Sequence, residues 1–211
     1  METISITYRG LVHKLTEYEK LADTIETIYA MCNQKITHWA DSITGKNGGK
    51  VKKYKRGKIL YNSLKNNELE RVSFFSLPEN FVTAAFDYTI YISINYKDKY
   101  ITAVFEKNIL KDKKVEAIKN MLSSYMELPY TEEIYTMDKE ETPLLYAARI
   151  NPKSSFKTLK ILSSKNGGVQ EREFNEKRML SMLLLVGVCL SITACSPIKP
   201  FLHISEWCMK F

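Results

Sequence analysis

Histidine and cysteine are both scarce in this sequence, and neither occurs in a pattern typical of a metal or redox site. The three histidines have no histidine or acidic partner at metal-ligand spacing, and no HExxH pattern occurs. The four cysteines show no CxxC spacing, and Cys32 falls on the apolar face of an expected helix, which predicts a buried thiol. We therefore expect no metal, no other cofactor and no disulfide framework, as in a cytoplasmic protein.

Motifs for catalysis and for phosphate binding are absent as well. No GxSxG pattern occurs, which leaves an elbow-type serine hydrolase unsupported. Gly45 and Gly49 enclose three residues instead of the four of a phosphate loop, and Val51 stands where that loop needs Ser or Thr. A thiolate–imidazole pair of Cys32 with His38 is disfavoured because Cys32 lies on the core-facing stripe. We therefore predict no catalytic residues, no enzyme, and a solvated loop around these glycines.

The whole chain carries a formal net charge of +7, and its basic residues gather in the first half. Residues 42–67 contain no acid, and aromatic rings alternate there with cations. Such a segment can bind nucleic acid, because cations neutralise phosphates and rings stack on bases. It can equally be a solvated edge strand, since lysines prevent edge-to-edge pairing; we favour this alternative because no known nucleic-acid-binding motif occurs. The candidate nucleic-acid-binding residues are Lys50, Lys52, Lys53, Tyr54, Lys55, Arg56, Lys58 and Tyr61.

Acidic residues gather later in the chain. They have no histidines around them and no DxD-type spacing, so they do not predict a metal site, and residues 138–141 fit a solvated turn. Their negative charge can still meet a basic partner. The members of this acidic group are Glu132, Glu133, Asp138, Glu140 and Glu141.

Two helices and several strands are expected in residues 1–168, which we predict to be one domain. Alternating Ile4, Ile6 and Tyr8 predict a strand that ends at Gly10. Apolar residues at helical spacing predict helices over about residues 17–34 and 112–126. Residues 69–77 form a short apolar segment closed by Pro78, and further strands are expected at 131–137 and 144–150, with another short strand at 156–162. The fold class is therefore α+β, a mostly antiparallel sheet with the two helices packed on one face.

The centre of the expected sheet is a hairpin over residues 86–106. Two β-branched and aromatic runs flank a polar turn at residues 97–100, which is typical of paired antiparallel strands. If residues 97–100 form the turn, Ile90, Ile92 and Ile94 share a face that can meet Ile101, Ala103 and Phe105. A one-residue slip would instead place Ile92 opposite Val104, and the sequence leaves the register open. The other face of the hairpin is mixed in polarity, so we expect one side to be core and the other to be only partly covered.

A different composition begins after residue 168. A charged connector, 169–178, leads into an apolar run that ends in small residues, the layout of a secretory h-region. The end of this run resembles the lipobox of bacterial lipoprotein signal peptides, which implies acylation of Cys195 if the segment is processed. Met1 opens directly into a strand pattern, so we expect no N-terminal signal peptide.

Three alternatives stay open for the tail, residues 179–211. It can be a C-terminal anchor that enters the membrane through residues 179–195 and holds the body on the cytoplasmic side. It can be an apolar element of the fold. It can also be the start of a neighbouring lipoprotein gene read in frame, which the abrupt change in composition favours slightly.

The order of elements resembles a known family. The elements that carry the resemblance are the strand with Ile6 and Tyr8, the long helix, Trp39, the segment 87–94 and the apolar residues 144–146. In their order the chain resembles the small immunity proteins of bacterial polymorphic-toxin systems, most nearly the immunity protein 52 family. The resemblance covers about residues 1–162, and the lysine-rich run at 50–58 departs from it.

The resemblance implies that the protein binds and neutralises a cognate bacterial toxin. Such toxins are often nucleases, whose substrate grooves are basic. The acidic group, Glu132 to Glu141, then supplies the expected contacts. The basic run could instead meet an acidic patch on the toxin. Nucleic acid remains the alternative partner.

Overall fold

The structure is a computed structural model that describes residues 1–13, 18–43, 50–56, 69–110, 112–147 and 153–167. These residues belong to one unit, Met1–Gly168. The predictions for the connector 169–178, for the tail 179–211 and for Cys195 lie outside the described residues.

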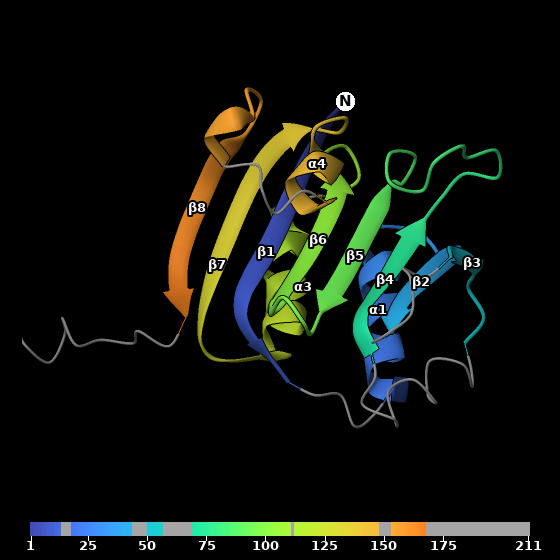
Figure 1. The fold of residues 1–211 in the computed structure, drawn as a ribbon, viewed down its shortest axis with the longest axis horizontal. Coiled ribbons are helices and arrows are strands. Elements are labelled where there is room, and N and C mark those ends of the chain that lie inside the picture. Colours follow the sequence, from blue (N-terminus) through green and yellow to red (C-terminus); the bar gives the residue numbers. More distant parts are fainter. Residues whose placement is uncertain (14–17, 44–49, 57–68, 111, 148–152, 168–211) are drawn as a thin grey trace, which may run out of the picture. The chain divides into compact units, whose positions relative to one another are not determined.

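An eight-stranded antiparallel sheet forms the frame of this unit (Figure 1). Its order is β3-β2-β4-β5-β6-β1-β7-β8, so the N-terminal strand lies inside the sheet and β3 and β8 form its edges. With few helices beside the sheet, this architecture is consistent with the predicted α+β class. The strands are β1 (Glu2–Val12), β2 (His38–Ile43), β3 (Lys52–Lys53), β4 (Leu69–Ser76), β5 (Ile90–Asn95), β6 (Tyr100–Glu106), β7 (Met126–Asp138) and β8 (Lys160–Gly167).

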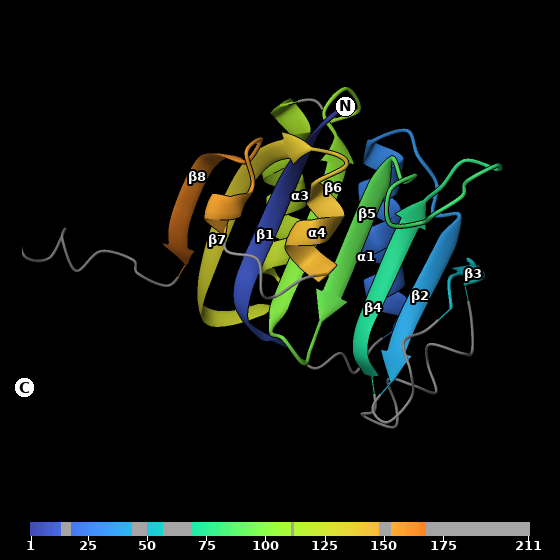
Figure 2. The same cartoon turned by 45° about the horizontal axis from the view of Figure 1, so that its top comes forward.

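The two longer helices lie behind the sheet in both ribbon views, and a short helix lies in front (Figures 1 and 2). Behind the sheet are α1 (Tyr18–Met31) and α3 (Asp112–Ser123); in front is α4 (Thr142–Ala147), followed by a short 3₁₀ turn, η1 (Lys153–Ser155). Most of one sheet face is therefore left to short segments rather than to long helices.

The main core fills the space between the sheet and the two longer helices. Ile25 and Ile28 of α1 and Ile118 of α3 are fully buried, as is Ile92 of β5. Period-2 alternation in the strands and helical spacing in α1 and α3 turn these aliphatic residues to the same interior. Burying each such side chain contributes roughly 1.5–3 kcal/mol.

Strands β5 and β6 are antiparallel neighbours at the middle of the sheet. Ile92 lies opposite Ala103 and Ile94 opposite Ile101, so the register is the one that joins the aliphatic residues across the pair. The turn between the strands includes Lys99, whose φ of 57° lies in the left-handed region.

Gly10 does not end the first strand, contrary to expectation. β1 continues to Val12, and its pairing with β7 shifts register between Gly10 and Val12. The φ of Gly10 is 151°, and a Cβ there would lie 2.9 Å from the Cβ of Tyr130. Glycine thus marks a bulge where two strands approach closely, rather than a strand end.

Three other boundaries differ from the sequence predictions. Residues expected as a strand from 144 begin a helix instead, because Pro143 stands in the first helical turn, where its fixed φ is favourable and its missing N–H costs nothing. The strand predicted at 156–162 lies further along the chain, as β8 (Lys160–Gly167), which pairs with β7 from Lys160 to Gly167. Helix α3 ends at Ser123, and Met126 and Pro129 belong to β7, not to the helix and its stop.

Candidate functional site

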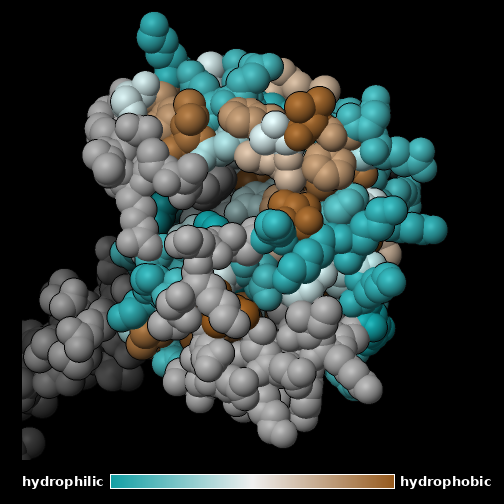
Figure 3. Space-filling view, turned by 45° about the vertical axis from the view of Figure 1, so that its right-hand side comes forward, coloured by the Kyte–Doolittle hydropathy of each residue, from teal (hydrophilic) through white to brown (hydrophobic). Residues whose placement is uncertain are grey.

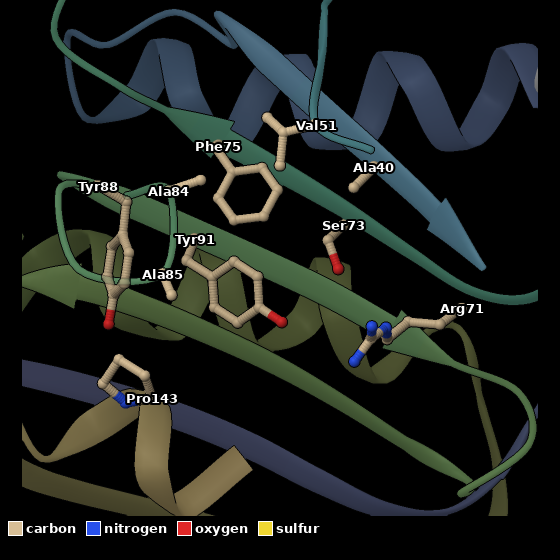
Figure 4. A pocket seen from close by; sticks show the side chains of 10 residues that line it. All are labelled: Ala40, Val51, Arg71, Ser73, Phe75, Ala84, Ala85, Tyr88, Tyr91 and Pro143. Atoms are coloured by element: carbon tan, nitrogen blue, oxygen red, sulfur yellow. The ribbon is translucent and has the colours of Figure 1, made fainter. Parts of the chain in front are cut away.

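A groove of about 260 Å³ opens on the face of the sheet opposite α1 and α3 (Figure 4). Strands β2, β4 and β5 form its floor, the segment 81–88 forms one wall, and α4 touches it through Pro143. Rings lie at one end of the view, and Arg71 and Ser73 lie at the other. The lining residues are Ala40, Val51, Arg71, Ser73, Phe75, Ala84, Ala85, Tyr88, Tyr91 and Pro143.

Strand alternation explains why this face combines polar and aromatic groups. On β4, Arg71, Ser73 and Phe75 turn to the groove, whereas Val72 and Phe74 between them are fully buried in the main core. Cross-strand pairing then places Tyr91 opposite Phe75. One face of β4 therefore packs in the main core, and the other, where Phe75 joins a second buried cluster with Leu77, Tyr88 and Val104, forms the floor of the groove.

The aromatic end of the groove is preorganised by ring contacts. The ring centroids of Phe75 and Tyr91 are 5.1 Å apart, and those of Tyr88 and Tyr91 are 5.6 Å apart. Lys139 Nζ lies 5.4 Å from the centroid of the Tyr88 ring and 2.6 Å from Oε1 of the buried Glu106. These contacts hold the partly exposed Tyr91 ring against the buried rings of Phe75 and Tyr88, which suits Tyr91 as a preorganised anchor for a partner.

The wall segment is held by a carboxylate turn. Asp87 accepts hydrogen bonds of 2.7 Å from the backbone N–H groups of Val82 and Thr83. The bond from Thr83 and then that from Val82 lower the pKa of Asp87, because they stabilise its charged form. The turn fixes Ala84 and Ala85, which line the groove and leave it open because their side chains are small.

Exposed apolar side chains stand on the segments around the groove. Val82 is 91% exposed and Phe86 40%, both on the wall segment, while Leu144 of α4 is 47% exposed. Figure 3 shows brown and tan side chains gathered around a hollow on this side of the molecule. Clustered exposed apolar groups of this kind mark interaction surfaces, whereas isolated ones are ordinary.

The first two residues of the predicted acidic group are already paired within the fold. Glu132 lies 2.9 Å from Lys119 Nζ and accepts a 2.9 Å bond from the Tyr8 hydroxyl, on the helix side of the sheet. Glu133 lies on the other face, next to Arg9 at 3.7 Å and to Lys153. The structure therefore separates these neighbours onto opposite faces, with cations beside both.

The remaining acids form the connection from β7 to α4. Glu141 accepts bonds from the backbone and hydroxyl of Thr158, the latter at 2.5 Å, and Glu140 is exposed. Asp138, at the end of β7, uses its carbonyl to accept a bond from Thr142. Because Lys139 in this turn contacts Tyr88, the acidic turn 138–141 borders the aromatic end of the groove.

Several of the basic residues are engaged inside the protein. Arg56 pairs with Asp23 and with Glu26, the latter at 3.1 Å. Tyr54 donates a 2.9 Å bond to Glu26. Lys52 lies 3.1 Å from Asp41 and 5.0 Å from the Trp39 ring centroid. Lys50, Lys53 and Lys55 are exposed beside or on β3, an edge strand as the sequence favoured, while Lys58 and Tyr61 lie outside the described residues.

The groove itself was not among the sequence predictions. Its signal was the mixed polarity of the second face of the hairpin, where Tyr91 interrupts small polar residues. The wall segment gave no periodic pattern, and only the register between β4 and β5 brings Phe75 to Tyr91. Sequence spacing alone does not reveal such cross-strand neighbours.

Within the described part of the chain, no group of three His, Cys, Asp or Glu residues is placed to hold a metal ion. None of the helices described there has the length and apolarity needed to cross a bilayer. Comparison with protein-family models, curated proteins and solved structures finds no match for this chain.

Proposed function

We propose that the protein binds one partner protein stoichiometrically through the groove and neutralises it, as an immunity protein neutralises a cognate bacterial toxin. The observation that carries the proposal is the groove, whose aromatic floor lies opposite α1 and α3 and is surrounded by exposed apolar side chains. The family resemblance supplies the biological role, and the groove supplies the place of contact.

The composition of the groove supports a protein partner. Binding energy in protein interfaces is concentrated in a few aromatic and arginine residues near the centre, which here correspond to Tyr91 and Arg71. A stable interface buries about 800 Å² on each partner. The groove therefore forms the centre of the contact, and the apolar side chains on the wall segment and α4 extend it.

The central hairpin serves as a scaffold in this proposal. With α1 and α3 packed behind it, β5 presents Tyr91 on the open face. The acidic turn 138–141 lies beside the aromatic end, and the basic residues around β3 lie beside β2. In this proposal the acidic turn 138–141 and the basic residues around β3 determine which partner binds, and the aromatic rings of the groove supply binding energy.

Nucleic acid is the second partner class because Lys50, Lys53 and Lys55 are exposed close together in the sequence. Binding of this kind is strongest at low salt, since it releases counterions. Titration with single- and double-stranded oligonucleotides at 20 and 200 mM salt tests this alternative. Absence of binding at 20 mM salt would exclude nucleic acid as the partner.

Growth under toxin expression tests the proposed function. The product of the adjacent reading frame is expressed with the wild-type chain, with Tyr91→Ala, with Val82→Asp, or with the control Leu128→Asp. Val82 and Leu128 are both exposed apolar residues, at 91% and 66%, but Val82 stands on the wall segment of the groove, whereas Leu128 belongs to β7, which contributes no lining residue.

We expect wild type and Leu128→Asp to restore growth, and Tyr91→Ala and Val82→Asp to restore it poorly while both stay folded. Val82→Asp should keep the wild-type urea midpoint, and Tyr91→Ala should unfold at a lower one because its ring packs on Phe75 and Tyr88. Killing that the wild-type chain does not relieve would contradict the immunity function. Full rescue by both groove variants would contradict the groove as its site.

A further inference from the structure

Arg71 is the one charged side chain among the described residues that line the groove. It is exposed, and no ion pair or hydrogen bond of its side chain is found within the described part of the chain. Figure 4 shows its guanidinium turned back toward the groove, on the side to which the Tyr91 hydroxyl also points. A guanidinium presents several N–H donors in a plane and matches a carboxylate well.

Two acids on the strands around Arg71 are already paired with other cations. Glu70, the preceding residue, lies 2.8 Å from Lys97 Nζ, and Asp41 on β2 lies 3.1 Å from Lys52 Nζ. The cross-strand partner of Arg71 on β5 is the neutral Asn95. Positive charge at this end of the groove is therefore left for an external group.

Strand geometry sets the distance between this charge and the aromatic end. Arg71, Ser73 and Phe75 alternate onto the groove face, and the guanidinium lies back along the strand toward Ser73 (Figure 4). Residues i and i+2 of an extended strand are about 7 Å apart. Arg71 and Phe75 are four residues apart on β4, about 13 Å in an extended strand, with Ser73 between them. Because the guanidinium of Arg71 lies back toward Ser73, an extended segment with an apolar side chain against Phe75 and Tyr91 brings its next same-facing residue within reach of the guanidinium.

We propose that the groove takes an extended, acidic segment of the partner protein, with an apolar anchor on Phe75 and Tyr91 and a carboxylate two residues away on Arg71. This inference rests on the proposed partner-binding function and specifies the chemistry of the segment. The charge complementarity selects an acidic segment over a basic one at this end, because a lysine there would face an unpaired guanidinium.

Two capped peptides test the inference on the full chain. One has the sequence acetyl-Ser-Phe-Ser-Glu-Ser-amide, and the other has Gln in place of Glu. Binding is followed by NMR titration of the ¹⁵N-labelled protein with wild type, with Arg71→Gln, and with Lys160→Gln. The last variant removes an exposed positive charge from β8, at the opposite edge of the sheet.

We expect the Glu peptide to bind the wild type and Lys160→Gln about twofold to fivefold more tightly than the Gln peptide, the range of an exposed ion pair. The difference should vanish in Arg71→Gln and shrink at 300 mM salt. Equal affinities in the wild type, a difference that persists in Arg71→Gln, or no shift of groove resonances would each overturn the inference. Growth rescue by Tyr91→Ala, in contrast, bears on the groove function itself, so the two failures are distinguishable.

Discussion

Removing the cation from the cluster of Tyr8, Lys119 and Glu132 should destabilise this fold strongly. Lys119 Nζ lies 2.9 Å from both Glu132 and Glu116, but the Glu132 side chain is 12% exposed and the Glu116 side chain 75%. Lys119→Met leaves the enclosed Glu132 carboxylate with only the Tyr8 hydroxyl as a donor. The cost of orphaning a buried charge is about 3–5 kcal/mol, and we expect about 3 here because Glu132 keeps some contact with water.

Matched variants separate this effect from general damage to α3. Glu116→Gln removes the exposed partner of the same lysine and should cost little stability, because water screens an exposed ion pair. Tyr8→Phe removes one bond to the carboxylate and should cost about 1–2 kcal/mol. Adding Glu132→Gln to Lys119→Met should recover part of the loss, since a neutral amide is less costly to bury. Urea unfolding gives the free energies, and a Lys119→Met loss no larger than that of Glu116→Gln would refute the reasoning.

Three further predictions concern the groove wall and two titrating groups. Asp87→Asn should speed amide exchange in residues 82–87 without lowering the urea midpoint much, and unchanged exchange would contradict the role of this turn. Burial lowers the pKa of His38, so protonation of His38 opposes folding. The free energy of unfolding should therefore fall as the pH is lowered from 7.5 to 5.5. This loss should be smaller in His38→Gln than in His13→Gln, the control at an exposed histidine. Burial also raises the pKa of the Cys32 thiol, so its peptide should be alkylated slowly in the native protein and rapidly in urea, as mass spectrometry can show.

Periodic segments of this chain were predictable, and segments whose structure depends on distant partners were not. The apolar spacing of α1 and the β-branched runs of β5 and β6 carry their own signals, because each turns one face to the same core. The polar strand β8 carries no such signal and forms because β7 supplies its backbone hydrogen bonds. The helix α4 was predicted as a strand because a short apolar run fits either structure. Pro143 at its beginning is the feature that favours a helix.

The sequence predicted charged groups elsewhere on the sheet, but not the groove itself. The acidic group is separated by the pleat of β7, which sends Glu132 to the helix side and Glu133 to the open face. The basic segment is partly neutralised by acids of α1, which lie more than twenty residues earlier in the sequence. The groove depends on the register of β4 against β5 and on the wall segment, and neither follows from local periodicity.

Hydrogen–deuterium exchange on the complex with the partner protein tests the central claim most directly. If the groove is the contact, amides of residues 71–76 and 82–91 should exchange more slowly in the complex than in the free chain, and those of the helix-side α3 should be unchanged. Protection confined to the basic segment 50–56 or to β7 residues 126–133, with the groove unchanged, would contradict the account.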